Sequence, residues 1–335
     1  MIIVRAPLRI SIGGGGTDLP SYYSLYEGEW ISAAINKYVY IIVNKRFQNK
    51  LRISYSKTEE VETVDQIEHP IVREALKLLK INGGVEIVSI ADIFSHTGLG
   101  SSGSFTVALL TALYTFMKNT NGWELPTRKE IAEKACHIAI DILKEPSGKQ
   151  DEYISAYGGI TAFYADKKGN ITVEPLYPHK ISLETVRELE NSLLLFYTGI
   201  KRESKQALKH QEKATLEGEK DMIENLHRVK EIGREIKKAL IRNDLRKFGE
   251  LLDLHWQEKI KRKGTSDERI NRWYQIAKEN GAIGGKLIGA GGGGFFLFYC
   301  EGRKDKLRQA MKKEGLKEEH FHFDFEGVKV IADII

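Results

Sequence analysis

The stretch His96-Thr-Gly-Leu-Gly-Ser-Ser-Gly-Ser-Phe105 is followed directly by the apolar run TVALLTAL at 106–113. Glycines and serines therefore stand where a loop becomes the first turn of a helix. The N–H groups of a first turn have no partner within the helix, and the helix dipole places about half a positive charge there. Such a place binds phosphate groups, and glycine lets the backbone approach them closely. The stretch predicts a phosphate-binding loop.

Two other interpretations of this loop stay open when it is considered alone. Ser101 or Ser102 could simply cap the helix while the glycines relieve a tight turn. The spacing also satisfies the dinucleotide motif G-x-G-x-x-G, but that motif directly follows its strand, whereas residues 91–97 separate the strand-like 85–90 from Gly98. The sequences G-x-x-x-x-G-K-[ST], H-R-D and D-F-G do not occur in the chain, which argues against P-loop NTPases and protein kinases.

Length and composition limit the class of protein. The 335 residues exceed the usual size of one hydrophobic core, so we predict two domains. The 51 Lys and Arg are interleaved with 46 Asp and Glu, which indicates solvated helix faces and argues against a nucleic-acid partner. No run of 18 uncharged apolar residues and no signal-peptide pattern occurs, so we expect a soluble cytoplasmic protein without a membrane partner. Cys136 and Cys300 are isolated and are expected in the core.

The order of the predicted elements changes halfway along the chain. Short strand-like runs alternate with glycine-rich turns and with helical patterns at 71–79, 102–117 and 128–143. From 203 to 254 the pattern is almost continuously helical, and a second mixed region follows to the end. We place the boundary near residue 185, which gives domains 1–185 and 186–335. Apolar spacings of three and four predict a core-facing row in the long helix: Ile223, Leu226, Val229, Ile232, Ile236 and Leu240.

Two further glycine-rich stretches accompany the loop. One is Ala6-Pro-Leu-Arg-Ile-Ser-Ile-Gly-Gly-Gly-Gly-Thr-Asp-Leu-Pro20, and the other is Lys286-Leu-Ile-Gly-Ala-Gly-Gly-Gly-Gly-Phe-Phe-Leu-Phe298. In order and spacing, over essentially the whole chain, the three resemble the motifs of the GHMP kinase superfamily, which includes galactokinase, mevalonate kinase and homoserine kinase. Within it, residues 6–20, GKQDEYISAYGG at 148–159 and YTGIKRES at 197–204 are most similar to the D-glycero-D-manno-heptose 7-phosphate kinases.

The resemblance implies an α+β fold with two domains. The N-terminal α+β domain would contain a left-handed crossover, the C-terminal domain would be ferredoxin-like, and the active site would lie between them. ATP would lie against the phosphate-binding loop, whose residues are Gly98, Leu99, Gly100, Ser101, Ser102, Gly103 and Ser104. The expected reaction is ATP-dependent phosphoryl transfer to a hydroxyl of a sugar or sugar phosphate, with the anomeric hydroxyl of D-glycero-D-manno-heptose 7-phosphate as the first choice.

The resemblance also assigns roles to individual side chains. Asp151 matches the catalytic aspartate, which takes the proton of the acceptor hydroxyl or holds it in line with the γ-phosphate. Arg9 matches a basic residue that stabilises developing charge. Asp18 matches an acid that binds sugar hydroxyls, and the neighbouring substrate contacts would be Gly15, Gly16 and Thr17. Arg202 would hold the phosphate of the acceptor. Gly291 and Gly292 would approach the substrate from the second domain.

Magnesium would bridge the β- and γ-phosphates, with Ser102 as one protein ligand. Relatives often place a glutamate on the helix before the catalytic aspartate, but here the corresponding residue is Ala139. Asp141 is therefore the alternative second ligand, unless phosphate, serine and water complete the shell.

Two alternatives remain for the activity as a whole. The chain could be a GHMP kinase of the fucose, galactose, inositol or mevalonate type, or a sensor that binds nucleotide and sugar without turnover. We expect a small-molecule substrate in every case, and a monomer or a homodimer.

Overall fold

Two β-sheets organise the chain, and the computed structural model describes residues 1–201 and 205–334. The first sheet has the strand order β12-β1-β2-β5-β3-β4, with β6 beside β2 and β7 beside β6. Its strands pair antiparallel except for β3 and β5. Their bounds are β1 (Ile2–Gly13), β2 (Gly28–Lys45), β3 (Leu51–Ser54), β4 (Thr58–Val61), β5 (Val85–Ala91), β6 (Ile160–Ala165), β7 (Ile171–Pro175) and β12 (Lys329–Asp333).

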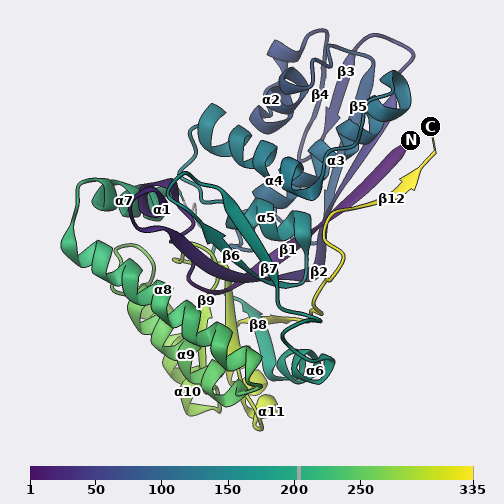
Figure 1. The fold of residues 1–335 in the computed structure, drawn as a ribbon. Helices are drawn as coiled ribbons and strands as arrows, with labels where there is room; N and C mark the ends of the chain where they lie inside the picture. Colours follow the sequence, from purple (N-terminus) through teal and green to yellow (C-terminus); the bar gives the residue numbers. More distant parts are fainter. Residues whose placement is uncertain (202–204, 335) are drawn as a thin grey trace.

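Helices α3 (Ser101–Asn121) and α5 (Gln150–Tyr157) of the first half pack directly against this sheet (Figure 1). Strand β1 is buried without a break from Ala6 to Gly13, which requires cover on both of its faces, and α3, α5, α8 and α9 pack against it. The helical bounds are α1 (Pro20–Tyr26), α2 (Pro70–Leu78), α3 (Ser101–Asn121), α4 (Arg128–Cys136), α5 (Gln150–Tyr157) and α6 (Leu183–Ser192), with a 3₁₀ turn η1 (Val64–Gln66) and a π-helical segment η2 (His137–Ile142).

The second sheet has the strand order β11-β8-β10-β9, and all its pairs are antiparallel. In chain order these are the fourth, first, third and second strands, with helices after the first and third, which is the ferredoxin-like arrangement. The predicted fold of the second domain is thereby confirmed. The bounds are β8 (Leu193–Tyr197), α7 (Lys205–Leu216), α8 (Lys220–Ile241), α9 (Leu245–Lys259), α10 (Glu268–Glu279), β9 (Gly284–Leu287), β10 (Phe295–Tyr299), α11 (Lys304–Lys313) and β11 (Lys317–Glu319).

The long helical stretch of the second half is interrupted. Gly218 has φ 74° and Asn243 has φ 55°, and a left-handed residue ends a right-handed helix. The Asp244 side chain then caps α9 by accepting the N–H of Lys247 at 3.0 Å. The stretch expected to be continuous from 203 to 254 is therefore divided among α7, α8 and α9 in the described residues. Leu226, Val229, Ile236 and Leu240 of its apolar row are fully buried, whereas Ile223 and Ile232 are half-buried.

The end of the chain returns to the first sheet. Strand β12 pairs with β1, and the N–H of Ile334 donates to the carbonyl of Met1 at 2.9 Å. Figure 1 shows the two termini together beside these strands. The predicted second domain, 186–335, therefore contains a last segment that belongs to the first sheet. The sequence did not predict this, because no sequence pattern shows which sheet edge an isolated strand will complete.

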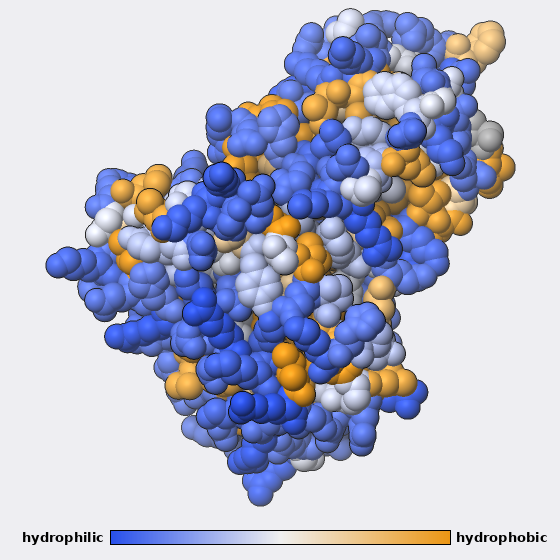
Figure 2. Space-filling view, viewed as in Figure 1, coloured by the Kyte–Doolittle hydropathy of each residue, from blue (hydrophilic) through white to orange (hydrophobic). Residues whose placement is uncertain are grey.

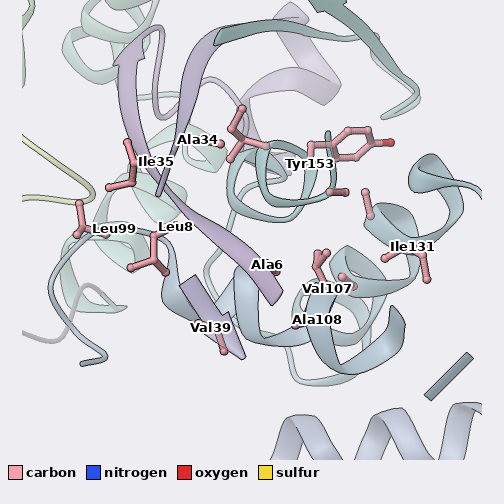
Figure 3. Packing of buried hydrophobic residues seen from close by; sticks show 14 of the residues in the cluster. Ala6, Leu8, Ala34, Ile35, Val39, Leu99, Val107, Ala108, Ile131 and Tyr153 are labelled. Atoms are coloured by element: carbon pink, nitrogen blue, oxygen red, sulfur yellow. The ribbon is translucent and has the colours of Figure 1, made fainter. Parts of the chain in front are cut away.

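The core is continuous between the two sheets. Buried residues of β8 and β10 belong to the same apolar cluster as β1, β2 and α3, while a second cluster around Trp256, Tyr274 and Phe298 fills the other face of the second sheet. Cys136 and Cys300 are both buried and free, as expected. Figure 3 shows Leu99 beside Leu8 in the larger cluster, so the phosphate-binding loop is anchored in the core.

The face of the molecule in Figure 2 is mostly hydrophilic, and its apolar residues lie in several groups, the most extended toward the upper right. Among the described residues, no helix combines the length and the apolarity that a bilayer crossing requires.

Candidate active site

Arg9 and Asp151 form the centre of the site. Asp151 lies in the first turn of α5, directly after the turn at Gly148, and Arg9 projects from the middle of β1. Both Nε and Nη2 of Arg9 lie 2.8 Å from Oδ1 of Asp151, and Nη1 donates to the carbonyl of Gly98. The arginine side chain is only 7% exposed and the aspartate 27%, so the carboxylate faces the cavity while the guanidinium lies behind it. The sequence prediction that these two residues act together agrees with this geometry.

Asp18 is held by the first glycine motif. Its Oδ1 accepts the N–H of Gly16 at 2.9 Å, and its Oδ2 accepts the N–H of Gln150 at 3.3 Å. Burial raises the pKa of this carboxyl, and the hydrogen bond from Gly16 opposes that effect. A methyl group on Gly148 would lie 1.9 Å from Oδ2 of Asp18, so glycine is required there to leave room for the carboxylate. The two motifs together place Asp18 beside Asp151.

The phosphate-binding loop leads into α3 without a side-chain cap. The N-cap residue is Gly100, with φ 79°, and no side chain bonds to the first turn, which argues against the interpretation of Ser101 or Ser102 as a plain cap. Ser102 is exposed at this end of the helix. Leu99 and Ser104 are buried, and the Ser104 hydroxyl donates to the carbonyl of Pro7 at 2.7 Å. Their side chains hold the loop in place, so only their backbone can serve a nucleotide.

The loop also packs tightly against the catalytic pair. A Cβ on Gly103 would lie 2.7 Å from Cβ of Asp151, and one on Gly100 would lie 3.0 Å from Cγ of Arg9. Glycine at these two positions therefore lets α3 approach α5 until the loop touches the Asp151 carboxylate. A phosphate bound at the loop would therefore lie close to the Asp151 carboxylate.

The third glycine motif joins the loop from the second domain. A Cβ on Gly289 would lie 2.8 Å from Cα of Gly98, so the two backbones are in contact. Gly289 and Ala290 line the cavity. Gly291 and Gly292, the residues predicted to contact the substrate, pack on Thr265 instead, and the N–H of Gly292 donates to the Thr265 carbonyl at 2.7 Å. The motif reaches the cavity through Lys286, Gly289 and Ala290 and not through Gly291 and Gly292.

The cavity between the two domains collects most of the predicted acceptor residues. It is lined from the first domain by Arg9, Gly15, Gly16, Asp18, Gly148 and Asp151. Thr17 is not among its lining residues, because its hydroxyl is buried and donates to the carbonyls of Gly14 and Glu29. Glu152 is buried next to Asp151, and burial, followed by the charge of Asp151, raises the pKa of its carboxyl.

The predicted metal ligand Asp141 and the loop residues Gly98 to Ser104 are not among the described residues that line this cavity. Asp141 lies in η2 with its side chain 61% exposed, and its Oδ2 is 2.8 Å from Nδ1 of His137. Its carboxylate is exposed and paired with His137, so its position gives no support to a magnesium role. Arg202, the predicted ligand of the acceptor's phosphate, lies outside the described residues.

The sequence interpretation missed the opposite wall of the cavity. Four cations and a histidine of the second domain line it: His255, Lys259, Arg262, Lys263 and Lys286. We call these five residues the basic wall. Only Lys286 stands next to a glycine motif, and the other four lie at or after the end of α9 among many surface charges. Among so many surface charges, no local sequence pattern marked these residues.

Comparisons with known proteins agree with this fold. A model described as the GHMP kinases N terminal domain matches residues 70–159, and one described as GHMP kinases C terminal matches residues 236–317. A D-glycero-alpha-D-manno-heptose 7-phosphate kinase from Campylobacter jejuni is 31% identical, covering 98% of this chain and 98% of the relative. The chain therefore belongs to the GHMP kinase family, as its three glycine motifs predicted.

Other relatives are more distant in sequence. A galactokinase from Pyrococcus furiosus is 26% identical over 96% of both chains. The crystal structure of a D-glycero-D-manno-heptose 1-phosphate kinase from Bacteroides thetaiotaomicron superposes with a TM-score of 0.80 at 23% identity and covers 100% of both chains. This likeness confirms the predicted two-domain fold.

Proposed function

We propose that the protein transfers the γ-phosphoryl group of ATP to the anomeric hydroxyl of D-glycero-D-manno-heptose 7-phosphate. The observation that carries the proposal is the Arg9 side chain, which pairs with Asp151 and also donates to the carbonyl of Gly98 in the phosphate-binding loop. One buried guanidinium thus connects the nucleotide side to the acceptor side. The name of the Campylobacter jejuni relative, 31% identical over 98% of the chain, supports this choice of acceptor.

Asp151 acts on the acceptor hydroxyl. Its Oδ1 is occupied by Arg9, whereas in the described part of the chain its Oδ2 accepts no hydrogen bond and is available to the hydroxyl. The acceptor oxygen forms a bond to the γ-phosphorus, the bond from the γ-phosphorus to the bridging oxygen breaks, and ADP leaves with that electron pair. The hydroxyl proton passes to Asp151. Arg9 stabilises the charge that develops on the transferred group.

ATP lies with its phosphates against Gly98 to Gly103 and the uncapped first turn of α3, where backbone N–H groups and the helix dipole favour negative charge. Among the described residues no group of three or more His, Cys, Asp or Glu could hold a metal by itself. Magnesium would then depend on phosphate oxygens and the exposed Ser102 hydroxyl, and it would neutralise phosphate charge. Because the reaction consumes ATP, we place it in the cytoplasm.

Asp18 orients the sugar. Each of its oxygens has one backbone hydrogen bond and retains a lone pair for a sugar hydroxyl. Gly15 and Gly16 line the same cavity and leave room for the sugar ring. The carboxylate is therefore fixed before the sugar binds, which reduces the entropy lost on binding.

The test is ADP release with ATP and Mg²⁺ over a panel of acceptors: heptose 7-phosphate, fucose, galactose, mannose, inositol and mevalonate. We expect the highest kcat/KM with heptose 7-phosphate, and a product with a new anomeric phosphate in its ³¹P spectrum. A higher kcat/KM for another sugar or alcohol of the panel would show that this compound, and not heptose 7-phosphate, is the acceptor. Binding of ATP without turnover on any acceptor would identify a sensor.

A further inference from the structure

The basic wall is unusual because three of its five residues, His255, Lys259 and Lys286, are buried. The exposed fractions are 4% for Lys259, 2% for Lys286 and 2% for His255, and the Nε atom of Arg262 is also buried. Burial, followed by the mutual repulsion of these cations, lowers the pKa of both lysines well below the usual range. Keeping several cations together out of water is unfavourable unless an anion joins them.

Within the described residues, no carboxylate lies within ion-pair distance of Lys259, Arg262 or Lys286. Lys259 donates to the carbonyls of Leu287 and Gly289, at 2.6 and 2.5 Å. Lys286 donates to the carbonyl of Ile12 at 3.3 Å. These partners are neutral carbonyls, and the bond from Lys286 to Ile12 joins the two domains.

Arg262 is the cation best placed for an additional ligand. Its Nη1 donates to Oε1 of Gln211 at 2.8 Å, and its Nε has no partner. The next positions along this side of the cavity are Lys263 and His210, which also line it. A guanidinium presents paired N–H groups that match the oxygens of a phosphate.

The position of Arg262 distinguishes an acceptor phosphate from the phosphates of ATP. A Cβ on Gly16 would lie 3.0 Å from Nη1 of Arg262, and Gln211 donates to the Gly16 carbonyl at 3.0 Å. Gly16 is the residue whose N–H holds Asp18. Arg262 therefore borders the sugar side of the cavity, whereas the phosphate-binding loop contacts Arg9, Asp151 and Gly289.

We propose that the basic wall is a subsite for a phosphate already present on the acceptor, with the Arg262 guanidinium as its direct ligand; this rests on the proposed function, because it assigns part of the same acceptor. Lys259 and Lys286 supply the surrounding positive charge. Lys263 and His210 lie at the outer side of the subsite. A sugar that carries a phosphate monoester is thereby favoured over the same sugar without one.

The experiment compares Arg262→Ala with wild type on heptose 7-phosphate and on the unphosphorylated heptose. Truncating one member of a buried charge pair raises KM for heptose 7-phosphate at least about thirtyfold. The KM for ATP stays within about twofold, because the nucleotide does not use this group. On the unphosphorylated heptose, the two proteins have equal kcat/KM. Arg262→Lys keeps the positive charge but lacks the paired N–H groups of the guanidinium, so its KM for heptose 7-phosphate lies between those of wild type and Arg262→Ala. Circular dichroism checks that each variant folds.

Arg272→Ala is the matched control. Its side chain is 73% exposed on α10, far from the cavity lining, and it removes the same charge. It leaves every KM unchanged. A second measurement uses calorimetric binding of inorganic phosphate and of heptose 7-phosphate without nucleotide, and binding of both weakens in Arg262→Ala.

The outcomes separate the subsite from the reaction. An unchanged KM for heptose 7-phosphate in Arg262→Ala, or an equal loss on the unphosphorylated heptose, overturns the subsite while the proposed reaction stands. A raised KM for ATP in Arg262→Ala would show that Arg262 binds the nucleotide, and this result also overturns the subsite. Binding of heptose 7-phosphate that depends on Arg262 but leads to no transfer supports the subsite and refutes the proposed reaction.

Discussion

The two sides of the active-site cavity differ in charge and in how they are built. The first-domain side presents the carboxylates Asp18 and Asp151, each fixed by hydrogen bonds from the backbone or from Arg9. The second-domain side is the basic wall, whose buried cations have only neutral partners among the described residues. The carboxylate side is complete without a ligand, whereas the basic wall is not. This difference suggests that the first side performs the chemistry and the second recognises charge.

The largest expected effect tests the chemical role of the first side. Asp151→Asn keeps the shape of the side chain but removes the base, so we expect kcat to fall by about 10² or more. Steady-state kinetics with saturating ATP and acceptor measure it. The affinity for ATP, measured by calorimetry, should stay near that of wild type. Full turnover in this variant would show that Asp151 is not the group that accepts the proton.

A smaller effect tests whether the basic wall is kept for binding at the expense of stability. In Lys286→Met an apolar side chain replaces a buried cation that has no carboxylate partner, so we expect the free energy of unfolding to rise by about 1 kcal/mol. The KM for heptose 7-phosphate should rise about tenfold, because a nearby positive charge is lost. Urea unfolding and kinetics measure the two quantities. A clear loss of stability would instead assign Lys286 a structural role.

The pH dependence gives a third test. Burial, followed by the nearby cations, lowers the pKa values of His255, Lys259 and Lys286, and Arg9 and Arg262 are the other charged groups that face them. A bound phosphate raises these pKa values again, so binding takes protons from solution. Affinity should therefore decline as pH rises and the cations lose their protons.

Calorimetric titrations with heptose 7-phosphate in buffers of different ionisation enthalpy count these protons. Lys286→Met should reduce the number taken up. Release of protons on binding would contradict the predicted proton uptake and would indicate that the phosphate contacts groups other than the basic wall.

The smallest expected effect concerns the acid that the sequence proposed for magnesium. Asp141 is exposed and paired with His137, so Asp141→Asn should change the free energy of activation by no more than about 0.5 kcal/mol. The Mg²⁺ concentration for half-maximal rate should not change. A tenfold higher Mg²⁺ concentration for half-maximal rate in Asp141→Asn would instead show that Asp141 contributes to magnesium binding.

Local sequence was sufficient to predict the first side of the cavity. Arg9, Asp18 and Asp151 each stand in or beside a glycine-rich motif, and these motifs record where the backbone must approach a phosphate or a carboxylate, as at Gly103 and Gly148. The ferredoxin-like domain followed from the same motifs through the family resemblance. The breaks in the long helical stretch were not predicted, because single left-handed residues such as Asn243 leave the apolar periodicity intact.

The sequence by itself thus determined the family, and its glycine motifs marked residues 98–104, Asp18 and Asp151 as the candidate site, because each motif depends on residues close together in the chain. Only the tertiary structure decided which lysines and arginines among the 51 enter the cavity, and that the last strand completes the first sheet. The physical reason is the same in both cases. Charge and strand pairing act between segments far apart in sequence, and a lysine on the surface and a lysine in the basic wall look alike until the chain is folded.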